Sequence, residues 1–182
     1  YLEEQYPDAF NLKASSLLAG PYDYFGFVKD LMTNREEENA NMAIYSWSVY
    51  SLNNYTSNLQ RNTNTIWTYD VVEQADAIAV VSDRPDEILQ TTFMDGMVNE
   101  TDATFVAAAK ANSLIEGWTP RAKLYFHSGT NDRIVPHYNS TRAHAHFQSI
   151  GVSSVLYEYP GGDHFTPEYE YVTKSLDDFN NL

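Results

Sequence analysis

The sequence contains no cysteine among its 182 residues. This absence excludes disulfide bonds, thiolate nucleophiles and zinc sites with cysteine ligands, but it does not distinguish a reducing from an oxidising compartment. No apolar run approaches the roughly 20 residues of a membrane-spanning helix, so no membrane span is expected. Basic residues are scarce as well, with 11 Lys and Arg against 25 Asp and Glu and a formal net charge of −14. Because this charge repels phosphate backbones, nucleic acid is not an expected partner.

The chain does not begin with methionine; its first residue is Tyr1. Residues 1–7 (YLEEQYP) are typical of a helix already under way and stopped by proline. Any targeting segment would lie upstream of this start, so the localisation is left unknown. The composition is 43% hydrophobic and 14% aromatic, which is ordinary for a globular protein and predicts a folded chain.

Two short apolar runs in the last third predict neighbouring parallel strands. Residues 123–126 (KLYF) lead into a polar loop that contains Asp132, and residues 155–159 (VLYEY) lead into a loop that contains His164. The stretch 140–150 between them reads as a helix. A strand–helix–strand unit of this kind has parallel strands, so we expect the two loops at the carboxyl ends of adjacent strands. This is the edge where α/β sheets hold their ligands.

The first two thirds of the chain predict one more strand and then a series of helices. Residues 11–19 are typical of a buried parallel strand that Gly20 and Pro21 bring to an end. Beyond residue 25 we expect helices near 28–32, along the apolar stripe of Met42, Tyr45, Val49 and Leu52, over 70–81 and 84–89, and from an N-cap at Thr101 to a stop at Gly117. A last helix over 167–182 is expected to pack on the sheet through Tyr171, Leu176 and Phe179.

These patterns resemble the C-terminal portion of the α/β-hydrolase fold, most closely its secreted lipases and carboxylesterases. The resemblance rests on G-x-x-D-x-x-V-P at 129–136, on GGDH at 161–164, on AGPYD at 19–23 and on the Trp118-Thr-Pro120 lead-in. It implies an α/β fold, with a mostly parallel sheet flanked by helices and a large helical cap insertion. Residues 1–25 and 119–182 would form the hydrolase core and residues 26–118 the cap. A secreted or periplasmic location would fit this group.

The resemblance also implies a Ser-Asp-His triad, in which nucleophile, acid and histidine follow in that order along the chain. Asp132 matches the acid and His164 the histidine, and both are predicted to be catalytic. No G-x-S-x-G occurs in these 182 residues, so the serine is expected upstream and the remainder of the chain is a required partner. Asp163 competes as the acid that orients His164, but adjacent side chains rarely point together. His127 is expected to brace the Asp132 loop.

The function implied is hydrolysis of a small-molecule carboxylic ester by the whole protein, without cofactor or metal. These 182 residues alone are expected to be inactive. Trp47, Tyr50 and Trp67 are candidates for the lining of an apolar acyl site, because aromatic side chains commonly line such pockets. Two alternatives remain open at this point. One is a serine peptidase similar to prolyl oligopeptidase, and the other is a noncatalytic hydrolase-like binding protein that has lost its nucleophile.

Overall fold

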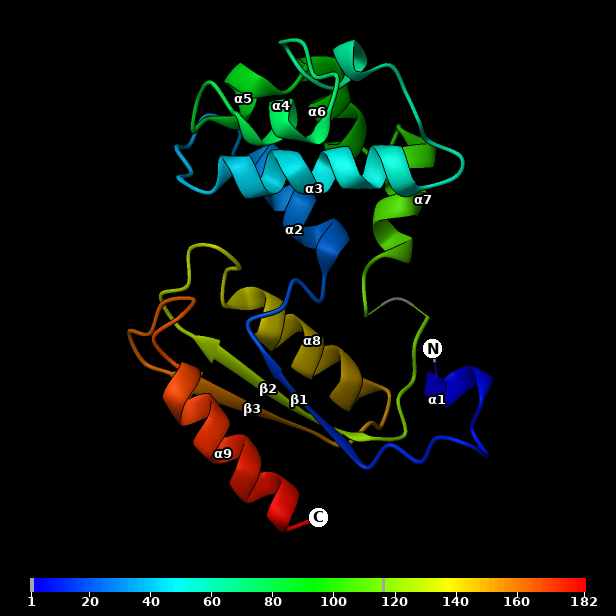
Figure 1. Ribbon diagram of the computed structural model, residues 1–182, viewed down its shortest axis with the longest axis vertical. Helices are drawn as coiled ribbons and strands as arrows, with labels where there is room; N and C mark the ends of the chain where they lie inside the picture. Colours follow the sequence, from blue (N-terminus) through cyan, green and yellow to red (C-terminus); the bar gives the residue numbers. More distant parts are fainter. Residues whose placement is uncertain (1, 116) are drawn as a thin grey trace. The chain divides into compact units, whose positions relative to one another are not determined.

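The computed structural model describes residues 2–115 and 117–182, and the chain divides into two compact units. The first unit comprises Tyr1–Asp23 and Leu114–Leu182 and holds the β-sheet (Figure 1). The second unit, Tyr24–Ser113, is built from helices and one isolated antiparallel bridge between Trp67 and Leu89. Within the described residues, no helix has the length and apolar character needed to cross a membrane.

The sheet of the first unit has three parallel strands in the order β1-β2-β3. They span Ala14–Leu18, Lys123–Gly129 and Ser154–Tyr159, which confirms the three predicted strands. β2 continues three residues beyond its predicted end at 126, so that its last residue, Gly129, pairs with Tyr159 at the end of β3. Both strands therefore end at the same level, and the loops that follow them start side by side.

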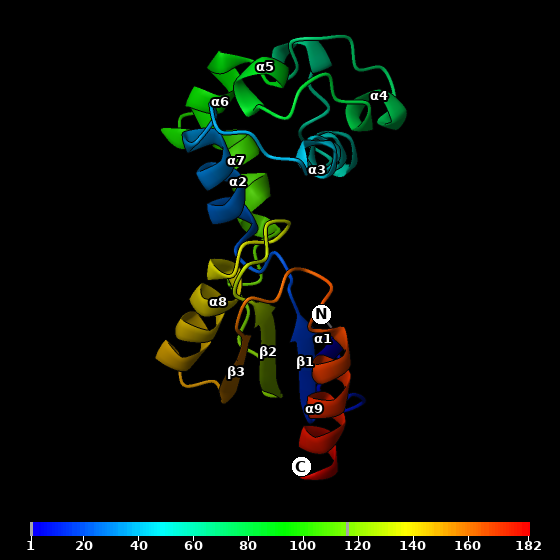
Figure 2. The ribbon, with the colours of Figure 1, turned by 90° about the vertical axis from the view of Figure 1, so that its left-hand side faces the viewer.

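Helices cover both faces of this sheet, α8 (Tyr138–Ser149) on one face and α9 (Glu168–Asn180) on the other (Figure 2). Successive side chains of a strand point to opposite faces. Leu124 and Phe126 of β2 accordingly join the buried cluster with α8, while His127 packs its ring edge-on against Tyr171 of α9. Both helices were predicted, over residues 140–150 and 167–182, and all four observed ends lie within two residues of those expected.

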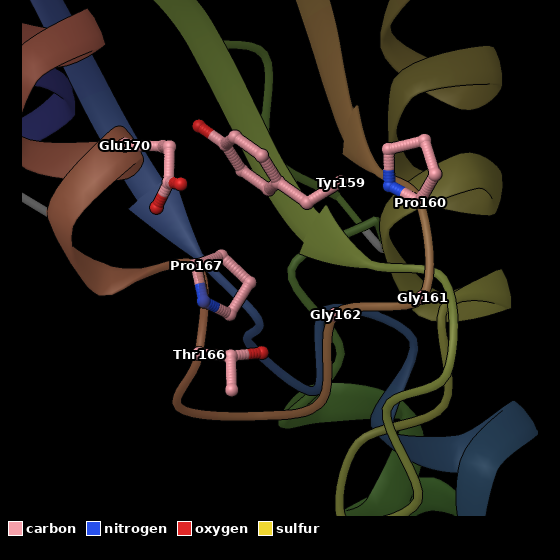
Figure 3. Close-up of a pocket in the computed structure, with 7 residues that line it drawn as sticks. All are labelled: Tyr159, Pro160, Gly161, Gly162, Thr166, Pro167 and Glu170. Atoms are coloured by element: carbon pink, nitrogen blue, oxygen red, sulfur yellow. The ribbon is translucent and has the colours of Figure 1, made fainter.

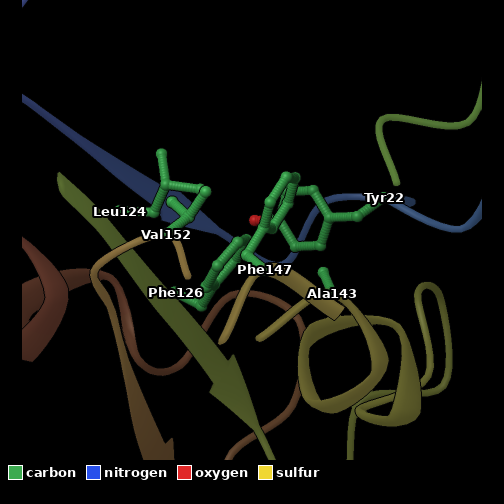
Figure 4. Close-up of a cluster of buried hydrophobic side chains, with 6 residues drawn as sticks. All are labelled: Tyr22, Leu124, Phe126, Ala143, Phe147 and Val152. Atoms are coloured by element: carbon green, nitrogen blue, oxygen red, sulfur yellow. The ribbon is translucent and has the colours of Figure 1, made fainter. Parts of the chain in front are cut away.

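The apolar core between the sheet and α8 is built around aromatic rings (Figure 4). The ring of Phe126 stacks on that of Phe147 with 6.0 Å between centroids, and Tyr22 meets Phe126 edge-on at 5.0 Å. Burial of one such side chain stabilises a fold by about 1.5–3 kcal/mol. This cluster fixes α8 on the sheet and with it the segment that joins β2 to β3.

On the face of the sheet that α9 covers, one residue predicted to pack against the strands does not do so. On α9 the buried residue is Ser175, and the Tyr171 hydroxyl donates to the Ser16 carbonyl of β1 at 3.2 Å. Leu176, expected to pack on the sheet, is 59% exposed, so this expectation is wrong. Residues 171 and 175 lie four apart and share a helix face, whereas the next residue points about 100° away from it.

The helical unit contains α2 to α7 and the short helix η1, and most of its predicted helices are confirmed. Their bounds are Tyr24–Thr33, Met42–Tyr55, Gln74–Ile78, Pro85–Ile88, Thr91–Val98 and Ala103–Ala111 for α2 to α7, and Thr63–Thr65 for η1. Large side chains with less than 2% exposure fill its interior, namely Met32, Met42, Ile66, Trp67, Ile88, Leu89, Phe93, Met94, Met97 and Phe105. The unit therefore has an apolar core of its own.

Two features of this unit depart from the predictions. No helix was predicted at α6, which buries Phe93, Met94 and Met97. The N-cap of α7 is Asp102 rather than Thr101, because the Asp102 carboxylate accepts the Phe105 amide at 3.3 Å. The same helix ends at Ala111 and not at Gly117, since the next residues bond elsewhere: Ser113 Oγ accepts the Phe25 amide at 2.9 Å.

Candidate active site

Asp132 is held by the turn that follows β2. The Asp132 amide donates to the Gly129 carbonyl at 3.3 Å, and the side chain is 0% exposed. Its Oδ1 accepts the amides of Ile134 and Val135, both at 2.9 Å. A buried carboxylate that accepts backbone amides has a fixed orientation and satisfied lone pairs. The remaining oxygen, Oδ2, is thereby directed to a single further partner.

That partner is His164, on the loop that follows β3. His164 Nδ1 lies 2.8 Å from Asp132 Oδ2, and the His164 side chain is 24% exposed. An ionised carboxylate only accepts hydrogen bonds, so Nδ1 of the neutral ring carries the proton and donates it to Oδ2. Nε2 then has a free lone pair. The two residues predicted to be catalytic are thus brought together across the ends of adjacent strands, in an arrangement that can orient a general base.

Asp163, the competing acid, serves the turn and not the imidazole. Its Oδ1 accepts the amides of Thr166 and Phe165, both at 2.8 Å, and its own amide donates to Thr166 Oγ1 at 2.9 Å. The backbone hydrogen bonds from Thr166 and Phe165 lower the pKa of the Asp163 carboxyl below its usual range. Its carboxylate therefore stabilises the loop that carries His164, while Asp132 is the acid bonded to the ring.

His127 forms a second polar cluster, on the α9 face of the sheet. The ring is 0% exposed, with Nε2 3.0 Å from Ser16 Oγ and Nδ1 2.8 Å from the Tyr159 hydroxyl. Ser16 Oγ in turn lies 2.6 Å from Ser175 Oγ of α9. Burial lowers the pKa of His127 to about 4. The expectation that His127 braces the Asp132 loop is wrong, because the two ring nitrogens bond to Ser16 of β1 and Tyr159 of β3, and Ser16 continues to Ser175 of α9.

A cavity of about 410 Å³ lies beside the loop of His164 (Figure 3). Its walls are the end of β3 with the residues that follow it and the first turn of α9, namely Tyr159, Pro160, Gly161, Gly162, Thr166, Pro167 and Glu170. In Figure 3 the Tyr159 ring extends from the strand end toward α9, where Glu170 lies. Since Tyr159 also bonds to His127, this cavity adjoins the polar cluster on the α9 face.

The three aromatic residues proposed for an acyl site differ in exposure. Trp67 is 1% exposed and its indole nitrogen donates to Ser46 Oγ at 2.8 Å. Tyr50 is 7% exposed and its ring lies 6.2 Å from that of Trp67, so both are part of the core of the helical unit. Trp47 is 43% exposed, which leaves it with surface to offer a ligand. Across the described residues, no group of three or more His, Cys, Asp or Glu side chains is arranged to hold a metal ion.

Three contacts near this site were not predicted from the sequence. They are the hydrogen bond of Ser16 with His127, the hydrogen bond of Tyr159 with the same ring, and the close approach of the His164 loop to Gly129. The last of these had a visible signal, because glycine stands at 129 after one strand and at 161 and 162 after the next. Glycine at such places commonly marks a close backbone approach.

Comparison with known proteins gives a result at the level of structure only. No protein-family model matches the sequence, and no curated protein matches it. Solved structures do match. A mutant of the rice cell wall degrading esterase LipA from Xanthomonas oryzae superposes with a TM-score of 0.78 at 19% identity, over 97% of this chain and 54% of LipA. Candida antarctica lipase A in its closed state gives a TM-score of 0.71 at 14% identity, over 96% of this chain and 43% of the lipase.

The chain has the α/β-hydrolase fold. This confirms the fold class expected from the sequence, a parallel sheet flanked by helices. The chain spans about half the length of the solved α/β-hydrolase structures that it matches.

Proposed function

We propose that this α/β-hydrolase chain is the acid- and histidine-bearing portion of a serine hydrolase that acts on carboxylic esters. The observation that carries the proposal is the 2.8 Å hydrogen bond between His164 Nδ1 and Asp132 Oδ2, with Asp132 Oδ1 held by two amides. The esterase and the lipase named above have the same fold, which supports this reaction class. The nucleophilic serine and the oxyanion-hole donors lie outside the 182 residues in this proposal.

The geometry suits the known order of proton transfers in such a triad. His164 Nε2 takes the proton of the serine hydroxyl as the serine oxygen attacks the ester carbonyl, and the imidazolium then gives that proton to the departing alkoxide. A water molecule repeats the sequence on the acyl-enzyme, losing a proton to Nε2 while the serine oxygen regains one. Throughout, Asp132 holds Nδ1–H and stabilises the imidazolium. His164 is therefore assigned as base and then acid, and Asp132 as the orienting carboxylate.

The helical segment 26–118 is assigned as a cap in the same proposal. It is inserted between β1 and β2, and as a compact unit of about ninety residues it is far longer than a plain connection of roughly 2–8 residues. Exposed Trp47 is its best candidate for contact with an acyl chain, whereas Tyr50 and Trp67 serve its core. If Trp47 contacts the acyl chain, Trp47→Ala should raise KM for esters with longer acyl chains more than for the acetate ester, because longer chains lose more apolar contact.

The test uses the full natural protein with p-nitrophenyl acetate and butyrate and a fluorophosphonate probe. We expect ester hydrolysis, labelling of one serine, and loss of at least about 10³-fold in kcat on His164→Ala. The control is His137→Ala, because His137 Nε2 also bonds to a carboxylate, Glu158 Oε1 at 2.8 Å, yet lies outside the proposed site. A folded natural protein that never labels with the probe rejects the serine hydrolase and favours a binding protein. Labelling with cleavage of peptides but not of esters would identify a peptidase.

A further inference from the structure

The backbone of the His164 loop lies directly against Gly129, the last residue of β2. A β-carbon placed on Gly129 would stand 2.3 Å from the Gly162 carbonyl oxygen and 2.4 Å from that of Asp163. Both neighbours are main-chain atoms, which no change of side-chain rotamer can move aside. The residues with positive φ do not include Gly129, so the need for glycine here comes from the close approach and not from the local backbone conformation.

Hydrogen bonds hold the two loops together at the same place. The Asn131 amide donates to the Gly162 carbonyl at 2.9 Å, and the Thr130 amide donates to the Tyr159 carbonyl at 3.0 Å. In the other direction, the Gly161 amide donates to Thr130 Oγ1 at 2.8 Å. Residues 129–131 and 159–163 thus form one contact, which we call the loop clamp.

The loop clamp stands next to both residues of the proposed pair. Asp132 follows Asn131 directly, and His164 follows the two carbonyls that face Gly129. Ordinary contact between two heavy atoms is at about 3.5 Å. To relieve a contact of 2.3 Å, the His164 loop and the end of β2 would have to move apart by roughly 1 Å. A hydrogen bond of 2.8 Å is lost or badly bent by a shift of that size.

We propose that Gly129 is a positioning residue for the Asp132–His164 pair, and that its missing side chain sets the separation between the acid loop and the histidine loop. The proposal rests on the hydrolase function proposed above, since it assigns a role to that pair. Gly129 acts through the backbone of the clamp, and Thr130 acts with it through its hydroxyl. Neither residue takes part in the chemistry.

The neighbouring glycines provide a graded series of substitutions. A β-carbon on Gly162 would stand 3.0 Å from Pro167 Cγ and 3.2 Å from the Tyr159 carbonyl, so it is crowded but less so. Gly151 has a φ of +81° and nothing within 4 Å of a β-carbon. Gly151→Ala is therefore strained in its backbone and loses stability, but it leaves the clamp untouched. It is the matched control for a loss of stability alone.

The direct readout is the tautomer of His164, measured by NMR on the full natural protein with 15N-labelled histidine rings at pH 8. The signal is assigned by its loss in His164→Gln. Wild type should carry its ring proton on Nδ1, as the bond to Asp132 requires. Gly129→Ala should shift a large share of the population to the Nε2 tautomer and lower kcat for p-nitrophenyl acetate by about 10²-fold, as a misplacement near 1 Å can do. Gly151→Ala should change neither quantity.

Thr130→Val keeps the size of the side chain and removes only the hydrogen bond to the Gly161 amide, so it decides the matter if Gly129→Ala does not fold. We expect a partial tautomer shift and a several-fold loss of kcat. An unchanged tautomer and rate in folded Gly129→Ala, or in Thr130→Val when the glycine variant is unfolded, overturns the clamp. A shifted tautomer in a protein that never hydrolyses esters keeps the clamp and rejects the proposed function.

Discussion

His127 Nδ1 lies 2.8 Å from the Tyr159 hydroxyl, and the imidazole that makes this contact has no exposed surface. Its other nitrogen is 3.0 Å from Ser16 Oγ, which continues to Ser175 Oγ of α9. A neutral imidazole with one donor and one acceptor is fully satisfied by two hydroxyl groups. The cluster therefore joins β1, β2, β3 and α9 through polar contacts.

Stability should fall as the pH is lowered, because His127 resists protonation in the fold. Its pKa is lowered to about 4, mainly by burial, whereas the nearby Asp178 charge opposes the shift and Lys174 adds to it. An unfolded histidine titrates near 6.5. Above about pH 6.5 both states are neutral, and between about 6.5 and 4 only the unfolded state takes up the proton, so this contribution is lost across that window, on the order of a few kcal/mol.

The measurement is the free energy of unfolding in urea from pH 4 to 8, for wild type and for His127→Gln. Glutamine can donate and accept but does not titrate, so the stability difference between the two proteins should shrink, or reverse in sign, as the pH falls. Carboxylates contribute equally to both proteins and cancel in this difference. A difference that stays constant over the whole range would show that the buried ring does not control acid stability.

Tyr159→Phe should destabilise the first unit by about 1–3 kcal/mol, because it leaves His127 Nδ1 buried without its partner. The measurement is the urea midpoint at pH 8, where His127 is neutral in both states. Tyr169→Phe is the matched control, since Tyr169 is 80% exposed and its change should lie within about 0.5 kcal/mol. Equal effects of the two variants would contradict the role given to the hydroxyl.

Asp102→Ala should destabilise the helical unit by about 1–3 kcal/mol, because this carboxylate caps α7 and also pairs with Arg61. The Arg61 guanidinium lies over the rings of Phe93 and Phe105, at 5.6 and 5.5 Å from their centroids. Asp95→Ala is the comparison, since Asp95 is half exposed and bonds only at the surface to Arg35 at 2.8 Å. Its cost should stay below about 1 kcal/mol. Thermal unfolding followed by circular dichroism compares the two.

Phe147→Ala should cost about 3–5 kcal/mol, because it opens a cavity between α8 and the sheet. Phe147 is 1% exposed and its ring contacts both Phe126 and Trp118. Phe10→Ala, at a side chain that is 43% exposed, should cost far less. Calorimetric unfolding of the two variants measures the difference. A tolerated Phe147→Ala would mean that α8 is not fixed by this cluster.

Much of the site was predictable because its signals are local. A short apolar run followed by glycine and polar residues marks a strand and its loop, and the rule for parallel strands places two such loops at one edge. On this basis Asp132 and His164 were expected on adjacent strand ends, where the structure brings them to 2.8 Å. The role of the pair in catalysis stays a prediction. So does the assignment of residues 26–118 as a cap.

The helix α6 and the contact between Ser16 and Ser175 could not be predicted from short stretches of the sequence. The helix α6 contains Gly96 and has no side-chain cap at Gln90, so its own sequence is a weak helix signal, and its three buried apolar side chains hold it in place. Ser16 and Ser175 lie 159 positions apart, yet their hydroxyl oxygens are 2.6 Å from each other. No periodicity in the sequence relates two such residues.

The strands, most of the helices, and the order of the acid and histidine loops follow from the sequence, because hydrophobic period and turn chemistry act over a few residues. The partners of His127, the task of Asp163 in its own turn, and the reason why residue 129 is glycine become visible only in the folded chain. The first and the last of these depend on contacts between segments far apart in the chain. Such contacts follow from how buried side chains pack and how buried polar groups find partners, which is a property of the folded chain as a whole.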